Sequence, residues 1–97
     1  MRIIAEKTLK EYWANHAEAQ GPLEAWREHV SRARWTCPAD VQKDYGADAV
    51  LPDNRVVFNI KGGHYRLVVH IHYKSQVVFI RFIGTHKEYD RIDARTI

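Results

Sequence analysis

Hydrophobic and polar positions alternate between Arg55 and Asp90, and this pattern predicts three consecutive β-strands. Two short polar breaks, Lys61–Gly63 and Lys74–Gln76, separate the three runs. Val, Ile, Phe and Tyr dominate each run, and these residues suit a pleated, half-buried surface. The glycine pair in the first break supplies the positive φ that a tight hairpin needs. We therefore expect an antiparallel meander.

Successive strand residues point to opposite faces of a sheet, so the alternation sorts this stretch into an apolar and a polar face. The apolar face is expected to contain Val56, Phe58, Ile60, Tyr65, Leu67, Val69, Ile71, Tyr73, Val78, Ile80 and Phe82, with Ile83 on the opposite side. The polar face is expected to gather Asn59, Lys61, Arg66, His70 and Arg81. Open antiparallel sheets often leave a polar face in water. The absence of acidic residues between Asp53 and Glu88 favours a binding surface instead.

The first half of the chain shows the three- and four-residue spacing that is typical of helices. Residues 6 to about 16 and 22 to about 34 form two amphipathic segments, the second after the start signal Gly21-Pro22. Residues 2–5 are expected to form a first strand, and residues 38–45 a short helix that Gly46 ends. We predict an α+β domain in which an N-terminal strand and a two-helix hairpin pack on one face of a three- to four-stranded antiparallel sheet.

A short C-terminal helical segment is expected to follow the third strand. Thr85 and Glu88 have the spacing of a capping box, in which the two residues satisfy each other's backbone N–H groups. This structural role does not explain why His86, Lys87, Tyr89 and Asp90 stand beside them. The cluster is therefore a candidate site next to the sheet.

Composition and charge narrow the function. The 97 residues suffice for a single domain, residues 1–97, and no apolar run is long enough to cross a membrane. The only cysteine cannot form an internal disulfide, and no signal peptide is recognisable, so we expect a cytoplasmic protein. Residues 1–48 hold 7 Lys+Arg and 8 Asp+Glu, whereas residues 49–97 hold 8 and 4. The basic half coincides with the sheet and favours a polyanionic partner such as nucleic acid.

Zinc binding is one alternative, because His70 and His72 lie on one strand face and His64 shares their parity. His64, however, is about 20 Å from His70 along a strand that rises ~3.3 Å per residue. No Cys or carboxylate has matching spacing, so we expect no metal. A non-catalytic RNA-binding module that uses the same basic face is the second alternative.

The order strand, helix, helix and three antiparallel strands resembles the RelE-like superfamily of small ribosome-dependent endoribonucleases. Residues 53–67 (DNRVVFNIKGGHYRL) and 83–93 (IGTHKEYDRID) resemble the HigB branch of type II toxin–antitoxin toxins. The resemblance implies a RelE-like fold and an mRNA interferase that inhibits translation on the ribosome without a cofactor. It also implies a HigA-like helix-turn-helix antitoxin, through which alone the toxin would reach operator DNA.

The resemblance further implies metal-independent cleavage, in which the RNA 2′-OH attacks the adjacent phosphate and leaves a 2′,3′-cyclic phosphate and a 5′-hydroxyl. Such a reaction needs a base, cations around the phosphate and an acid for the leaving oxygen. We assign Arg66 to transition-state charge and His86 to proton transfer, since histidine ordinarily titrates near pH ~6.5, with Lys87 and Tyr89 in support. Asn59, Lys61, His70 and Arg81 are RNA-binding candidates, and Asp90 is an orienting residue.

Three questions stay open from the sequence. Arg66 would have a purely structural role if its guanidinium formed an ion pair with Asp90 or Glu88. His86 would be a plain helix residue if nothing engaged it. The assignment of one residue as base and another as acid is not fixed by the sequence.

Overall fold

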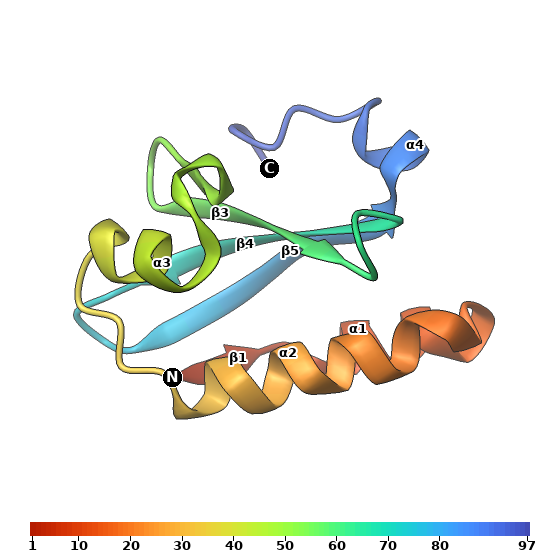
Figure 1. Ribbon diagram of the computed structural model, residues 1–97, viewed down its shortest axis with the longest axis horizontal. Coiled ribbons are helices and arrows are strands. Elements are labelled where there is room, and N and C mark those ends of the chain that lie inside the picture. Colours follow the sequence, from red (N-terminus) through yellow and green to blue (C-terminus); the bar gives the residue numbers. More distant parts are fainter.

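Strands β3 (Arg55–Ile60), β4 (Tyr65–His72) and β5 (Val77–Thr85) form the predicted antiparallel meander in the computed structural model, which describes residues 1–97 (Figure 1). The remaining elements are β1 (Arg2–Ile4), α1 (Glu6–Asn15), η1 (Ala17–Ala19), α2 (Gln20–Arg32), α3 (Pro38–Tyr45), η2 (Ala47–Ala49), β2 (Val50–Leu51) and α4 (His86–Tyr89). The α+β class and the order of elements are confirmed. No helix has the length and apolar character needed to span a bilayer.

The sheet has five strands in the order β1-β5-β4-β3-β2, one more than predicted. The additional strand, β2, contains only two residues, which is too short for a periodic signal. The sheet is also mixed, because β1 pairs with β5 in parallel, with Ile3 opposite Val78. The chain travels through α1, α2 and α3 between these two strands, and a crossover of this length permits parallel pairing.

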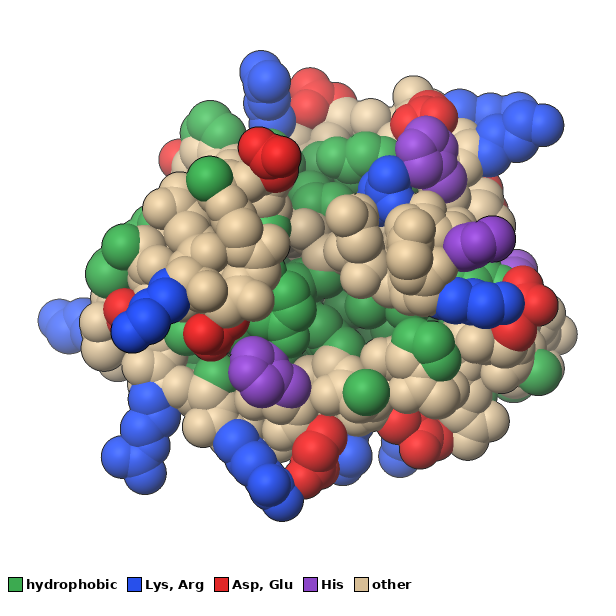
Figure 2. All heavy atoms as spheres, in the orientation of Figure 1, with side chains coloured by type: hydrophobic (Ala, Val, Ile, Leu, Met, Phe, Trp, Pro, Cys, Tyr) green, Lys and Arg blue, Asp and Glu red, His purple; other side chains and the backbone are tan.

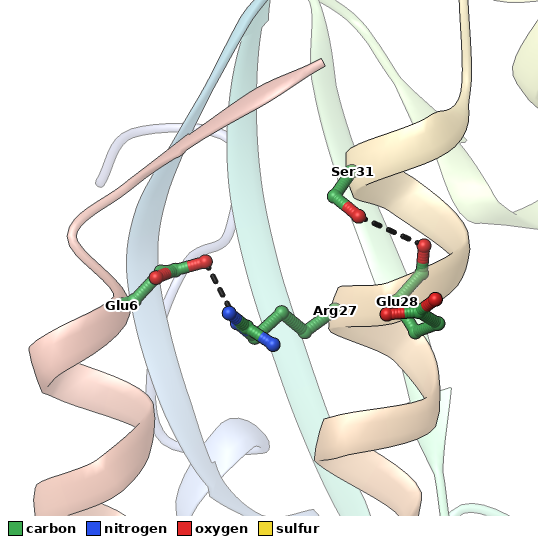
Figure 3. Close-up of polar contacts among 4 residues, drawn as sticks. All are labelled: Glu6, Arg27, Glu28 and Ser31. Carbon is green, nitrogen blue, oxygen red and sulfur yellow. Dashed lines mark hydrogen bonds and ion pairs between the residues drawn. The ribbon is translucent and has the colours of Figure 1, made fainter.

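Helices α1 and α2 lie side by side across one face of the sheet, and together they cover its apolar side (Figure 1). Trp26 of α2 packs edge-on against Phe58 of β3, with ring centroids 5.3 Å apart. Arg27 Nε of α2 donates to a carboxylate oxygen of Glu6 in α1 at 2.8 Å, which links the two helices (Figure 3). Helix α2 begins at Gln20, so Pro22 is its third residue rather than its first.

A β-bulge in β5 reverses the predicted alternation near the end of the sheet. Val68 lies opposite Phe82, whereas Val69 lies opposite Ile80, which leaves Arg81 without a partner on β4. One extra residue in a strand moves every later side chain to the other face. The placement of Phe82 on the apolar face is therefore wrong, and Ile83 packs against the core in its stead.

Two further segments close the ends of the sheet. Helix α3 packs near β2 and buries Val41 completely. Helix α4 continues directly from β5 and contacts β4. The C-terminal residues then run back over the meander, where Arg55 Nε donates to the carbonyl oxygen of Ile97 at 2.8 Å. The polar face of the sheet is thus partly covered, and a hollow lined by residues of α3, η2 and α4 remains open on it.

Candidate functional site

Arg66 is the cation at the centre of the uncovered face. It lies on β4 directly opposite Asn59 of β3 on one side and Gly84 of β5 on the other. Its Nη1 donates to the carbonyl oxygen of Gly63 at 2.5 Å, and its Cζ lies 5.9 Å from the ring centroid of Tyr89. No carboxylate pairs with it, so the structural alternative in which Asp90 or Glu88 neutralises Arg66 is wrong. The remaining guanidinium N–H groups are free to bind an anion.

The β3–β4 turn that holds Arg66 depends on its glycines. Gly62 and Gly63 have φ values of 61° and 95°, which glycine adopts without strain. A Cβ at Gly63 would lie 2.9 Å from Arg66 Nη1, so the missing side chain also makes room for the guanidinium. Gly84, opposite Arg66 on β5, makes room for a different group, because a Cβ there would lie 2.5 Å from Cζ of Phe82. The glycine pattern therefore shapes the space around the cation.

Helix α4 is held by the capping box that the sequence predicts. Glu88 N donates to Thr85 Oγ1 at 3.1 Å, and Thr85 N donates to Glu88 Oε1 at 2.8 Å. The bonds from Thr85 lower the pKa of Glu88, so this carboxylate stays ionised in its structural role. His86 N also donates to the carbonyl oxygen of His64 at 3.0 Å, which ties α4 to the β3–β4 turn. These bonds place Tyr89 over Arg66.

Two hollows adjoin α4, and the expected catalytic residues divide between them. The first, called the Arg66 hollow, has a volume of about 420 Å³ and is lined by Asn59, Arg66 and Tyr89 together with residues of α3, η2, β2 and β3. The second, called the His86 hollow, has a volume of about 500 Å³ and is lined by Glu18, the turn residues 62–65 and residues 85–87. The structure thus groups Arg66 with Tyr89, and His86 with Lys87.

His86 has a defined partner. Its Nδ1 lies 3.1 Å from a carboxylate oxygen of Asp90, one helical turn away, and both side chains are more than half exposed. Through this contact Asp90 could hold the imidazole in one orientation, and its role as an orienting residue stays a prediction. It leaves Nε2 of the imidazole directed away from the carboxylate, as a proton-transfer group requires.

The other RNA-binding candidates do not gather around Arg66 as expected. Lys61 Nζ lies 3.7 Å from Glu18 Oε2, on the helix side of the sheet. Its positive φ of 53° at the start of the turn breaks the strand alternation, which explains the wrong placement. Arg81 is exposed at the bulge. His70 lies further along β4, and burial, Arg55, His72 and Arg81 all lower its pKa, so it is mostly neutral at neutral pH.

The alternative metal site does not form. His70 and His72 have ring centroids 5.5 Å apart, but His64 is on the turn at the other end of β4. No three His, Cys, Asp or Glu side chains meet in a group that could hold a metal ion.

Sequence reasoning missed Glu18, which connects η1 to the β3–β4 turn. Tyr65 Oη donates to Glu18 Oε1 at 2.5 Å, and Lys61 lies near the other carboxylate oxygen. The bond from Tyr65 and the charge of Lys61 lower the pKa of Glu18. The tyrosine and the carboxylate are 47 residues apart in the chain, so local spacing gives no sign of this contact.

Comparison with known proteins identifies a protein family that matches this chain. A model of HigB toxins, described as the RelE-like toxic component of a toxin–antitoxin system, matches residues 19–92. The mRNA interferase toxin HigB of Escherichia coli (strain K12) is 29% identical over 98 residues, covering 93% of this chain and 88% of that protein. The mRNA interferases HigB of Escherichia coli O157:H7 and of Shigella flexneri match with the same identity and coverage.

Proposed function

Because this chain belongs to the HigB family of RelE-like toxins, we propose that it cleaves mRNA at the Arg66 face of its sheet while the message is on the ribosome. The chain is the toxic component of a toxin–antitoxin system and an endoribonuclease of the mRNA interferase type. The single observation that supports the position of the site is the unpaired, oriented guanidinium of Arg66. It is fixed by Gly63 and Tyr89 and opposes Asn59 across the sheet.

The residues around α4 suit metal-independent transesterification. Arg66 holds the scissile phosphate and stabilises the charge of its five-coordinate transition state, a role for which a guanidinium fork is well shaped. His86, oriented by Asp90 at 3.1 Å, transfers a proton to or from the reacting oxygens. Lys87 lies beside His86 and adds positive charge, whereas Tyr89 supports the guanidinium and offers a ring to a base.

An antitoxin is the partner that membership of the family implies. We propose that it is a HigA-like helix-turn-helix protein, and that the toxin reaches operator DNA only through it. The ribosome and mRNA are the other proposed partners, in a cytoplasmic setting. The basic C-terminal half, with 8 Lys+Arg against 4 Asp+Glu, supports a polyanionic partner.

Induced expression tests the proposal. Wild type, Arg66→Ala and His86→Ala are compared for growth and for mRNA integrity, with Arg95→Ala as a control that removes an exposed arginine outside both hollows. We expect wild type and Arg95→Ala to stop growth and fragment translated mRNA. Arg66→Ala should lower cleavage at least about 100-fold, as loss of a transition-state contact does.

The result that contradicts the proposal is equally clear. If folded wild type leaves translated mRNA intact, the chain does not act as an interferase. If wild type binds RNA without cutting it, and Arg66→Ala removes only binding, the non-catalytic RNA-binding module is the better account. Circular dichroism of each purified variant separates loss of function from loss of fold.

A further inference from the structure

We propose that the Arg66 hollow binds the RNA base next to the cleaved phosphate, and that Asp48 and Asn59 there select bases that carry an exocyclic amino group. The inference rests on the proposed function, because it takes the phosphate to lie at Arg66. It adds Asp48 to the residues of this surface, and it gives Asn59, so far only an RNA-binding candidate, a role in the choice of base.

The size and lining of the hollow suit a small ligand such as a single base. Its volume of about 420 Å³ falls within the ~300–1,000 Å³ range of small-molecule sites. The α3–η2 connection forms one wall with the small residues Gly46, Ala47 and Ala49. Arg66 and Tyr89 form the other wall. Figure 2 shows some hydrophobic side chains uncovered above β3, between the lobe that contains α3 and the end that carries α4.

Apolar and aromatic groups provide the stacking surface. Leu51 and Val57 contribute apolar surface from β2 and β3. Tyr45 at the rim is the one large hydrophobic side chain of the protein that is exposed. It is held rigidly, since its Oη lies 2.7 Å from His29 Nδ1 and its ring packs edge-on against Phe58 at 4.7 Å. Single-stranded RNA is recognised in this way, with splayed bases stacked on aromatic rings or arginine planes.

Two polar side chains in the hollow have no partner within the chain. Neither the amide of Asn59 nor the carboxylate of Asp48 makes a hydrogen bond or ion pair, although both line the hollow. A carboxylate only accepts hydrogen bonds, and an amide both donates and accepts. The pair is therefore free to bind the edge of a base that lies between the two walls.

The carboxylate of Asp48 determines which bases the hollow favours. Adenine, cytosine and guanine each present an exocyclic amino group that Asp48 can accept from, as carboxylates do from cytosine N4. Uracil presents a single N–H between two carbonyl oxygens, and these oxygens are repelled by a carboxylate. Asp48 also repels the RNA phosphate, which therefore belongs at the Arg66 end of the hollow. We expect few uridines at the position that occupies this hollow.

The experiment maps the 5′-hydroxyl ends of cleaved mRNA after induction, in wild type, Asp48→Asn and Asn59→Ala. Asp53→Asn is the matched control, because it makes the same chemical change at an exposed residue outside the hollow. Asparagine also tolerates the φ of 61° at position 53. Asp48→Asn should raise the share of uridine at the selected position by about 5- to 10-fold, the range of a base contact worth ~1–1.4 kcal/mol. Asn59→Ala should flatten the base preference, and Asp53→Asn should reproduce the wild-type pattern.

The possible results of this experiment distinguish failure of the proposed function from failure of the base site. Intact mRNA with wild type overturns the proposed function and the base site with it. Cleavage by wild type that Arg66→Ala abolishes, together with unchanged base preferences in Asp48→Asn and Asn59→Ala, overturns the base site and leaves the function standing. Unchanged preferences with weakened neutralisation by the antitoxin would assign the hollow to a protein partner instead. The isosteric Asp48→Asn variant decides the matter if Asn59→Ala fails to fold.

Discussion

Replacing Gly63 by alanine tests whether the β3–β4 turn positions the guanidinium of Arg66, the proposed phosphate contact. The new Cβ would lie 2.9 Å from Arg66 Nη1, and the backbone would keep a φ of 95° that side chains rarely adopt. The guanidinium is the flexible end of a long side chain, so it would move rather than the backbone. Arg66 would then lose its bond to the Gly63 carbonyl and its place beside Tyr89.

The expected magnitudes separate stability from activity. A left-handed φ costs a non-glycine residue roughly 1–2 kcal/mol, and the lost hydrogen bond about 0.5–1.5 kcal/mol at most. For a domain of this size, each kcal/mol lowers the melting temperature by about 4–8 °C. A displacement of about 1 Å in a positioned catalytic group costs up to ~100-fold in rate. We therefore expect a folded protein whose cleavage rate falls by about 10- to 100-fold.

Gly62→Ala is the control within the same turn. Gly62 also has a positive φ, 61°, but a Cβ there would meet no atom within 4 Å. The Gly62→Ala variant therefore introduces the same kind of backbone strain but no contact with Arg66. Thermal melting and cleavage of a translated message are measured for both variants. Equal cleavage rates for Gly63→Ala and Gly62→Ala, at similar stability, would refute the idea that Gly63 places Arg66.

Three further predictions follow from other contacts. Tyr65→Phe should destabilise the protein at neutral pH, and the difference from wild type in urea unfolding should shrink as pH falls. The reason is that the bond from Tyr65 lowers the pKa of Glu18 below its ordinary value of 4.5. The stabilisation is therefore present above pH 4.5 and is lost as pH falls through the lowered pKa. A difference between the two proteins that did not change with pH would contradict this explanation. Thr85→Ala should lower the free energy of unfolding by about 1 kcal/mol by removing the cap of α4, whereas Thr8→Ala, at an exposed position, should not. Asp90→Asn should leave stability within about 1 kcal/mol, since its contact with His86 is exposed, but should slow cleavage about tenfold by misaligning a proton-transfer group; an unchanged rate would remove Asp90 from the site.

The sheet was predictable where strict alternation holds. Phe58 and Leu67 face the core as the period of two requires. The prediction failed at Phe82 because a bulge inserts one unpaired residue, Arg81, and nothing in the local sequence marks it. It failed at Lys61 because this residue, with a φ of 53°, belongs to the turn, where the strand alternation no longer applies.

The candidate site was predictable in its local parts only. The Thr85–Glu88 capping box is a short-range signal, and it correctly places the start of α4. The Arg66 hollow depends instead on α3 and η2 lying against β3, and the role of Glu18 depends on a contact across 47 residues. Such contacts follow from the tertiary packing, which the periodicity of a single segment does not encode.

The parallel pairing of β1 with β5 bears on how the chain folds. The meander joins neighbours in sequence, whereas Ile3 meets Val78 only after a loop of about 75 residues has closed. Closing long loops costs entropy before any contact repays it. We therefore expect the β3–β4–β5 hairpins to dominate the folding transition state, and β1 to dock late. A conservative change such as Ile3→Val should then speed unfolding and leave the folding rate nearly unchanged.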